Sequence, residues 1–297
     1  RAAGARMLCR GEDGYPAALA VVPDAPPVLW VIGDAGLLAR PAVALVGARN
    51  ASSLGLRMAR RLAEGLGAAG FAVISGLARG IDAEAHQAAL ATGTVAVMAG
   101  GVDVVYPPEN TGLAGEIAAQ GCRISEQPMG LQPQTRHFPQ RNRVISGLAR
   151  AVVVVEAAER SGSLITARAA LDQGREVLAV PGHPFDARAA GCNMLIRDGA
   201  TLVRGPADVV AAVGEGAPPR ATGAVAPGAP ARQATPLARV TNLHSLILAR
   251  LGPSPLPEDL LIRDLSLPAG EVAAELVALE LEGRVQRQAG GLLSRLD

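Results

Sequence analysis

The strongest constraint on the fold is a regular alternation of short apolar runs and helix-like segments between residues 41 and 213. Residues 43–46 and 151–155 are short runs rich in β-branched side chains, which is typical of strands buried on both faces. The segments that follow them, 52–69 and 164–172, have apolar positions at helical spacing. Strands that alternate with helices form a parallel sheet. We therefore predict an α/β fold, a Rossmann-like domain with a mostly parallel sheet and helices on both faces.

The segments outside this domain, which we place at residues 41–213, have different patterns. Residues 1–40 contain three prolines between positions 23 and 27 and are predicted to be irregular. Because the sequence does not begin with Met, we also expect upstream residues to be missing. Residues 214–238 are rich in Ala, Gly and Pro, which predicts a flexible linker. Residues 239–297 contain three helix-like segments and a final hairpin pattern around Gly290, which predicts a small C-terminal winged-helix domain.

Arginine supplies all 28 basic side chains, and the formal net charge is only +1. A chain without lysine has neither a P-loop lysine nor a Schiff-base lysine, which excludes both kinds of site. Two windows, 35–63 and 127–155, carry five and four arginines and no acidic residue. Such windows are either solvated faces or parts of an anion-binding site.

The cysteines and histidines do not form a metal-ligand pattern. Cys9, Cys122 and Cys192 are too far apart for a metal site or a disulfide framework, which favours a reducing, cytoplasmic location. The four histidines are scattered. No apolar stretch is long enough to span a bilayer, so no membrane partner is expected. We expect no metal and no cofactor.

Small, hydroxyl-bearing and basic residues follow several of the predicted strands. In an open parallel sheet, ligands bind at the carboxyl ends of the strands. Glycine lets the backbone approach a ligand, helix N-termini offer free N–H groups, and arginine binds phosphate through a fork of donors. The alternative is that each of these turns is only structural, and the G-x-G-x-x-G dinucleotide fingerprint is absent. Together the turns predict a phosphate-binding rim that contains Arg49, Ser52, Gly76, Arg79, Ser161 and Ser163.

The segment 137–143 combines an aromatic side chain with two arginines. Because a residue before proline is disfavoured in a helix, Phe138 is predicted to lie on a loop. An exposed ring there could stack on a base while Arg141 and Arg143 hold the nucleic-acid backbone. The alternative is that Phe138 anchors the loop to the core, since most phenylalanine side chains are buried.

Catalytic patterns are weak, and we predict that the chain is not an enzyme. The sequence contains neither a G-x-S-x-G elbow nor an H-E-x-x-H motif. Glu156 follows a buried strand and is either a base or a structural acceptor. By fold analogy alone, a nucleotide-hydrolysing enzyme with Glu156 or Glu126 as its acid is the alternative function.

In combination, these motifs resemble the DprA (Smf, DNA-processing) family from about Tyr15 to Val213, with a looser match beyond. One departure is Gly47-Ala48-Arg49, where the family has Gly-Ser-Arg. The stretches that carry the resemblance are 75–82 with Ala85-His86, 106–110, 125–126, 138–145, 161–166, 181–182, 191–193, 195–196 and 199–200.

The resemblance implies a Rossmann-like domain that binds single-stranded DNA and forms a homodimer. It also implies that the protein protects incoming DNA and loads the RecA recombinase during natural transformation. A dimer or recombinase surface is expected near Leu195 and Ile196. Carried over residue by residue, the family's DNA pocket corresponds to Arg49, Ser52, Gly76, Arg79, Phe138, Arg141 and Asn142.

Overall fold

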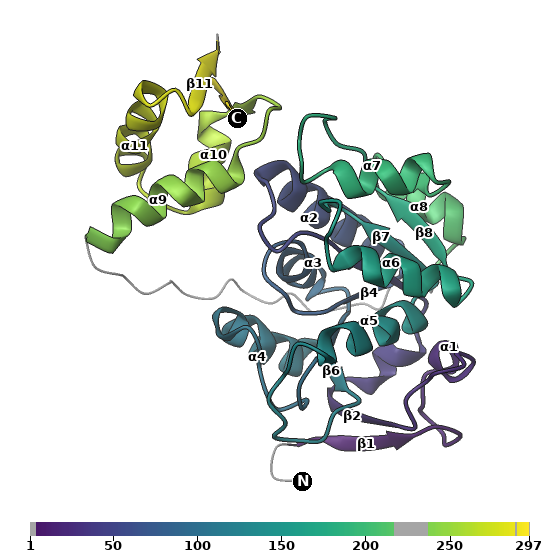
Figure 1. Ribbon diagram of the computed structural model, residues 1–297. Coiled ribbons are helices and arrows are strands. Elements are labelled where there is room, and N and C mark those ends of the chain that lie inside the picture. Colours follow the sequence, from purple (N-terminus) through teal and green to yellow (C-terminus); the bar gives the residue numbers. More distant parts are fainter. Residues whose placement is uncertain (1–3, 217–236, 289, 297) are drawn as a thin grey trace.

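The computed structural model describes residues 4–216, 237–288 and 290–296. Its larger domain contains a nine-stranded sheet with the order β1-β2-β6-β5-β4-β3-β7-β8-β9 (Figure 1). From β6 to β9 all neighbouring strands are parallel, which confirms the mostly parallel sheet. These strands are β3 (Ala42–Val46), β4 (Ala72–Ser75), β5 (Thr94–Val97), β6 (Cys122–Ser125), β7 (Ala151–Val154), β8 (Glu176–Ala179) and β9 (Thr201–Leu202).

Helices cover both faces of the sheet, as predicted. The clusters of buried side chains divide the helices into two groups. The helices on one face are α1 (Ala17–Ala20), α5 (His137–Leu148), α6 (Ser163–Asp172) and α7 (Ala190–Arg197). The helices on the other face are α2 (Ser53–Ala68), α3 (Ile81–Ala89), α4 (Thr111–Gln120) and α8 (Pro206–Val213).

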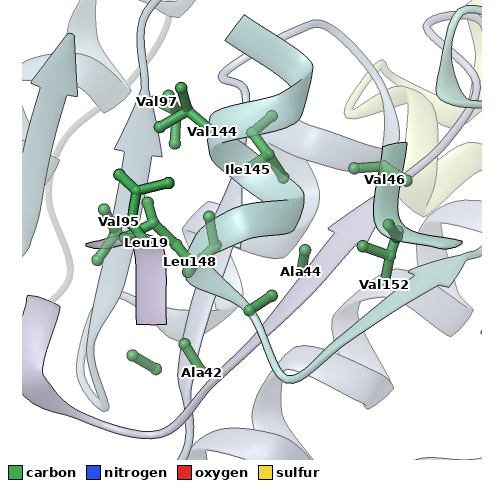
Figure 2. Close-up of a cluster of buried hydrophobic side chains, with 14 of the residues drawn as sticks. Leu19, Ala42, Ala44, Val46, Val95, Val97, Val144, Ile145, Leu148 and Val152 are labelled. Atoms are coloured by element: carbon green, nitrogen blue, oxygen red, sulfur yellow. The ribbon is translucent and has the colours of Figure 1, made fainter. Parts of the chain in front are cut away.

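Side chains alternate between the two faces along each buried strand. On β3, Val46 belongs to the cluster under α5, whereas Leu45 belongs to the cluster with α2 and α3. Figure 2 shows Val144, Ile145 and Leu148 of α5 among the strand side chains of the first cluster. Complete burial of one such side chain contributes about 1.5–3 kcal/mol. This packing fixes α5, whose first turn carries several of the candidate site residues.

The prediction that residues 1–40 are irregular is wrong. This segment contains β1 (Arg6–Cys9), β2 (Val28–Gly33) and the 3-10 helix η1 (Ala35–Ala39). The strand β2 pairs antiparallel with β6, and β1 pairs with β2. The prolines precede β2 rather than interrupt it, so they remove no ladder hydrogen bond. Pairing with β6, which is distant in the sequence, stabilises a strand that local pattern does not reveal.

The predicted loop position of Phe138 is also wrong. The helix α5 begins at His137, so Phe138 and Pro139 both lie in its first turn. Proline is tolerated there because the first N–H groups of a helix have no intrahelical partner. Phe138 therefore lies in a helix although the residue before a proline is disfavoured there, because Pro139 stands at the start of the helix.

The strand order reverses direction at one point in the sheet. The chain leaves β3 towards β4 on one side, whereas β7, on the other side of β3, is followed by β8 further out. The loops after β3 and β7 therefore diverge and leave a crevice between them. Such a switch point is where open α/β sheets bind ligands.

The smaller domain is a winged helix, as predicted. Its three-stranded sheet has the order β10-β12-β11, and its helices pack around a separate core that includes Ile247, Leu261 and Leu276. Its elements are α9 (Leu237–Arg250), β10 (Leu256–Pro257), α10 (Glu258–Leu265), α11 (Ala269–Leu281), β11 (Val285–Gln288) and β12 (Leu292–Arg295). Most of the predicted linker, residues 217–236, lies outside the described residues.

Two arginines join the domains. Arg188 donates from Nη1 to the Ala249 carbonyl oxygen at 2.6 Å and from Nη2 to the Leu251 carbonyl oxygen at 2.8 Å. Arg250 donates to the Ala51 carbonyl oxygen at 2.8 Å. Arg188 thus binds the carbonyl groups at the end of α9, which have no partner inside that helix. Over the described part of the chain, no helix has the length and apolar character needed to cross a membrane.

Candidate nucleic-acid interface

A groove of about 640 Å³ occupies the switch point, and we call it the switch-point groove. Its walls are residues 46–50 after β3, residues 158–163 after β7, and the first turns of α5 and α6. A smaller pocket of about 170 Å³ adjoins it, since Arg49, Ala78, Phe138 and Arg141 line both. We call this second space the aromatic pocket. Both lie at the carboxyl edge of the sheet, where the sequence predicted the site.

An arginine and two rings form the border between the two spaces. The Arg49 guanidinium carbon lies 5.4 Å from the centre of the Phe138 ring. The rings of Tyr106 and Phe138 pack at a centroid distance of 5.7 Å and an angle of 60°. Phe138 is partly exposed, and nearly half of the Tyr106 surface is open to solvent. Phe138 therefore offers an accessible ring beside a cation rather than filling the core.

Arg141 is buried and is committed to the protein backbone. Its Nη1 donates to the carbonyl oxygens of Gly76 and Val97, the latter at 2.7 Å. Its Nε has no hydrogen-bond partner among the described residues. Burial lowers the pKa of Arg141 to about 10, and nearby Asp82 opposes that shift. Its main contacts hold the turn after β4 in place beneath both spaces. Arg141 lines both of them, and its predicted contact with the nucleic-acid backbone stays a prediction.

Gly76 is required by this contact. A Cβ atom at position 76 would lie 1.8 Å from Nη1 of Arg141, so a larger residue would force the guanidinium out of this position. The Gly76 N–H donates to the Asp82 carboxylate at 3.0 Å. Burial raises the pKa of Asp82, while Arg141 and the backbone donors lower it. Gly76 lines the aromatic pocket, at the carboxyl edge of the sheet.

Ser52 does not reach the switch-point groove. Its hydroxyl accepts a hydrogen bond from the Gly55 N–H at 3.0 Å and donates to Glu156 Oε2 at 2.6 Å. Glu156 also accepts from the Ser52 N–H at 3.0 Å. Burial raises the pKa of Glu156, and the bonds from Ser52 oppose the rise. The Ser52 hydroxyl thus caps α2, and its predicted phosphate contact stays a prediction. Glu156 acts as a structural acceptor, one of the two roles that the sequence left open.

Arg143 lies apart from the other predicted residues. It forms ion pairs with Glu126 and Asp24 and donates to the Asp24 carbonyl oxygen. These partners stand beside β6 and the segment before β2, and Arg143 lines neither of the two spaces. The structure thus places Arg143 away from both spaces, and its predicted phosphate contact stays a prediction. Because one helical turn separates positions about 3.6 residues apart, Arg141 and Arg143 point to different sides of α5.

The remaining predicted residues do come together. Asn142 donates to the Gly162 carbonyl oxygen at 3.4 Å, and the hydroxyl groups of Ser161 and Ser163 are 2.8 Å apart. All three line the switch-point groove. Arg79 is exposed in the aromatic pocket, 3.7 Å from Glu109.

The partner surface expected at α7 is only partly accessible. Leu195 and Ile196 are partly buried and pack against the core under α5, α6 and α7. A contact with a second chain at these positions remains a prediction.

Several lining residues were not among the predicted site residues. Tyr106 meets Phe138, and Asn50, Arg160 and Arg188 line the switch-point groove. Arg160 follows the same strand as Ser161, so position after a strand was an available signal for it. Tyr106 and Arg188 have no such signal, because each lies in a long loop, well beyond the end of β5 or β8.

The described residues contain no cluster of three or more His, Cys, Asp or Glu side chains arranged to hold a metal ion. The two carboxylates that the hydrolase alternative needs are engaged in other contacts, Glu156 with Ser52 and Glu126 with Arg143.

Comparisons with known proteins agree over both domains. The family model described as DNA recombination-mediator protein A matches residues 6–214, and that of the DprA winged helix domain matches residues 229–291. Protein Smf of Synechocystis sp. is 34% identical over 316 residues, which cover 96% of this chain and 79% of that protein. The DNA processing protein DprA of Streptococcus pneumoniae is 45% identical over 202 residues, or 67% of this chain and 71% of that protein.

Two solved structures have the same fold over the larger domain. The X-ray structure of the Streptococcus pneumoniae DprA protein has a TM-score of 0.67 at 43% identity, over 69% of this chain and 73% of that chain. The Helicobacter pylori DprA structure, which describes that protein's single-stranded DNA binding mode, has a TM-score of 0.65 at 28% identity. It covers 70% of this chain and 94% of that chain.

Proposed function

Because the chain belongs to the DNA recombination-mediator protein A (DprA) family, we propose that it binds single-stranded DNA along the switch-point groove and the aromatic pocket. Its Helicobacter pylori relative binds single-stranded DNA. The observation that supports the proposal most directly is the Arg49 guanidinium over the partly exposed Phe138 ring. Stacking on an aromatic side chain is sequence-tolerant because every base has a π-face.

The groove beside this ring supplies the contacts that a sugar–phosphate backbone needs. Arg49 and Arg160 are exposed cations on its two walls. The Asn142 amide and the Ser161 hydroxyl add neutral donors between them. Arginine forms charge-assisted, bidentate hydrogen bonds to phosphate. In this arrangement bases stack on Phe138 and Tyr106 while phosphates follow the line from Arg49 to Arg160.

We extend the proposal to the biological role. The protein protects an incoming single strand in the cytoplasm and loads RecA recombinase onto it during natural transformation, without chemical turnover. A homodimer contact through the exposed parts of Leu195 and Ile196 completes this role. Sedimentation of the chain alone tests the homodimer contact, and sedimentation of its mixture with RecA tests the RecA contact. A chain that sediments as a monomer, alone and in the mixture, would contradict both.

Titration of a fluorescent single strand and the matching duplex, at two salt concentrations, tests DNA binding. The single strand is expected to bind more tightly, with an affinity that falls as salt rises because phosphate contacts release counterions. Phe138→Ala removes one stacking platform, which corresponds to about 1–3 kcal/mol, or about 5- to 150-fold weaker binding. Arg49→Ala reduces the salt slope by about 0.7.

Arg204→Ala is the matched control, because Arg204 is an exposed arginine paired with Asp208, outside both spaces. It is expected to bind the single strand like the wild type. Binding that does not depend on salt, or full affinity in the Arg49→Ala/Phe138→Ala double variant, would contradict the proposed site.

A further inference from the structure

A second groove lies on the opposite side of Glu156, between the two domains, and we call it the interdomain cleft. Its volume is about 670 Å³. Its walls are the first two turns of α2, the loop of residues 180–189 after β8, and residues 250–256 of the winged helix. Figure 1 shows the loop before α7 beside the segment that follows α9. The cleft therefore exists only where the winged helix is docked.

The charged side chains of this cleft that lack an ion-pair partner among the described residues are arginines. Arg57 and Arg61 line it one helical turn apart on α2, and both are exposed without an ion pair among the described residues. The two carboxylates in the wall have partners of their own. Glu156 binds Ser52, and Asp186 forms a salt bridge of 3.1 Å with Arg188.

An exposed aromatic side chain stands on the loop that forms one wall. Phe185 is 81% exposed, the largest exposed fraction of any described aromatic side chain. Its ring packs on His183 with a centroid distance of 5.6 Å. The loop is held by backbone hydrogen bonds from Asp186 to His183 at 2.9 Å and from Ala189 to Asp186 at 2.8 Å. A solvent-accessible aromatic ring is the kind of platform on which single-strand-binding proteins stack bases.

The interdomain cleft adjoins the switch-point groove, from which a layer of contacting side chains separates it. Glu156 and Asp186 line the cleft, and Arg188, which contacts both carboxylates, lines the groove. The two spaces thus share one thin wall at the carboxyl edge of the sheet. The switch-point groove combines Arg49 with the Phe138 ring. The cleft is lined by Arg57, Arg61 and His183, and Phe185 stands next to it by packing on His183.

We propose that the interdomain cleft binds a second stretch of the same single-stranded DNA, with phosphates on Arg57 and Arg61 and a base stacked on Phe185. This inference rests on the proposed function, because it extends the path of the strand beyond the switch-point groove. A polyanion is favoured over an acidic or apolar protein segment because free arginines and a flat exposed ring together match the backbone and the bases of a single strand.

Oligonucleotides of two lengths separate the two binding regions. A strand of about six nucleotides can occupy the switch-point groove alone, whereas one of about twenty can occupy both spaces, given typical site sizes of about 4–16 nucleotides per domain. Affinities of both strands are measured with the full chain. The long strand is expected to bind more tightly and with a steeper salt dependence.

The variants Arg57→Ala/Arg61→Ala and Phe185→Ala then test the contacts. Each is expected to weaken binding of the long strand about tenfold and to leave the short strand unchanged. The double arginine variant should also reduce the salt slope for the long strand by about 1.4, which is two phosphate contacts. Arg60→Ala is the matched control on the same helix, because Arg60 is paired with Glu84 and lies outside the cleft.

The outcomes separate this inference from the proposed function. If the wild type binds neither strand, the proposed function fails. If it binds the short strand but the three substitutions leave long-strand affinity and salt slope as in the wild type, the function stands and the extended path is overturned. The same result would favour a protein segment over DNA as the ligand of the cleft.

Discussion

His86 lies buried under the turn that follows β4 and is neutral in the folded chain. Its Nδ1 meets the Thr94 hydroxyl at 2.7 Å, and its Nε2 accepts from the Leu77 N–H at 3.3 Å. Burial, aided by Arg141, lowers the pKa of His86 to about 3, whereas an unfolded histidine titrates near 6.5. Between these values the unfolded state binds the additional proton, so this group lowers stability as pH falls below about 6.5. Urea unfolding of wild type and His86→Gln at pH 7 and pH 5 measures the effect. The wild type should lose more stability, by up to about 1.4 kcal/mol per pH unit. Asp82 has a raised pKa and the opposite sign, but it is present in both proteins and cancels in the comparison. Equal pH slopes would show that His86 is protonated in the native state.

The helix α2 begins with a side-chain cap, in which Ser52 accepts a hydrogen bond from the Gly55 N–H. Ser52→Ala removes the acceptor for the Gly55 N–H and one donor to buried Glu156. Loss of a cap together with a partly unsatisfied buried acceptor is expected to cost about 1–3 kcal/mol in the free energy of unfolding. Because the Ser52 hydroxyl lies outside the switch-point groove, affinity for a short single strand should change by less than about twofold. Urea denaturation measures the free energy of unfolding, and the short-strand titration measures the affinity for DNA. Comparison with Glu156→Gln and with the double variant measures the coupling between Ser52 and Glu156. A variant with wild-type stability and weakened DNA binding would return Ser52 to the phosphate-binding role.

At the scale of the whole molecule, the position of the winged helix depends on two arginines that bind backbone carbonyl groups. Arg188 contacts the end of α9 and Arg250 contacts the start of α2. Charged donors to carbonyl groups contribute about 1.5–3 kcal/mol each, so Arg188→Ala/Arg250→Ala is expected to release the winged helix while each domain stays folded. Small-angle X-ray scattering should then show a larger radius of gyration, and circular dichroism an unchanged helix content. Arg204→Ala, which removes an exposed arginine remote from the interface, serves as control. An unchanged scattering profile in the double variant would mean that other contacts hold the domains together.

The parallel sheet and its binding edge could be predicted from the sequence, whereas contacts between distant segments could not. The parallel strands were predictable because runs such as 151–155 are apolar on both faces, and strand ends then bring Arg49 and Phe138 to one edge. The strand β2 was not, because its pairing with β6 is a tertiary contact. Residue type alone could not tell buried Arg141 from exposed Arg49, since the difference depends on which carbonyl groups the fold places nearby.

The contact between Arg141 and Gly76 joins two positions that are 65 residues apart in the chain. The guanidinium fills the volume that any side chain at position 76 would need. In evolutionary terms, the order of change matters: a larger residue at 76 fits this arrangement only after 141 has been shortened, and arginine returns to its place only if 76 is glycine again. Descendants of this sequence should therefore inherit the two residues as a pair.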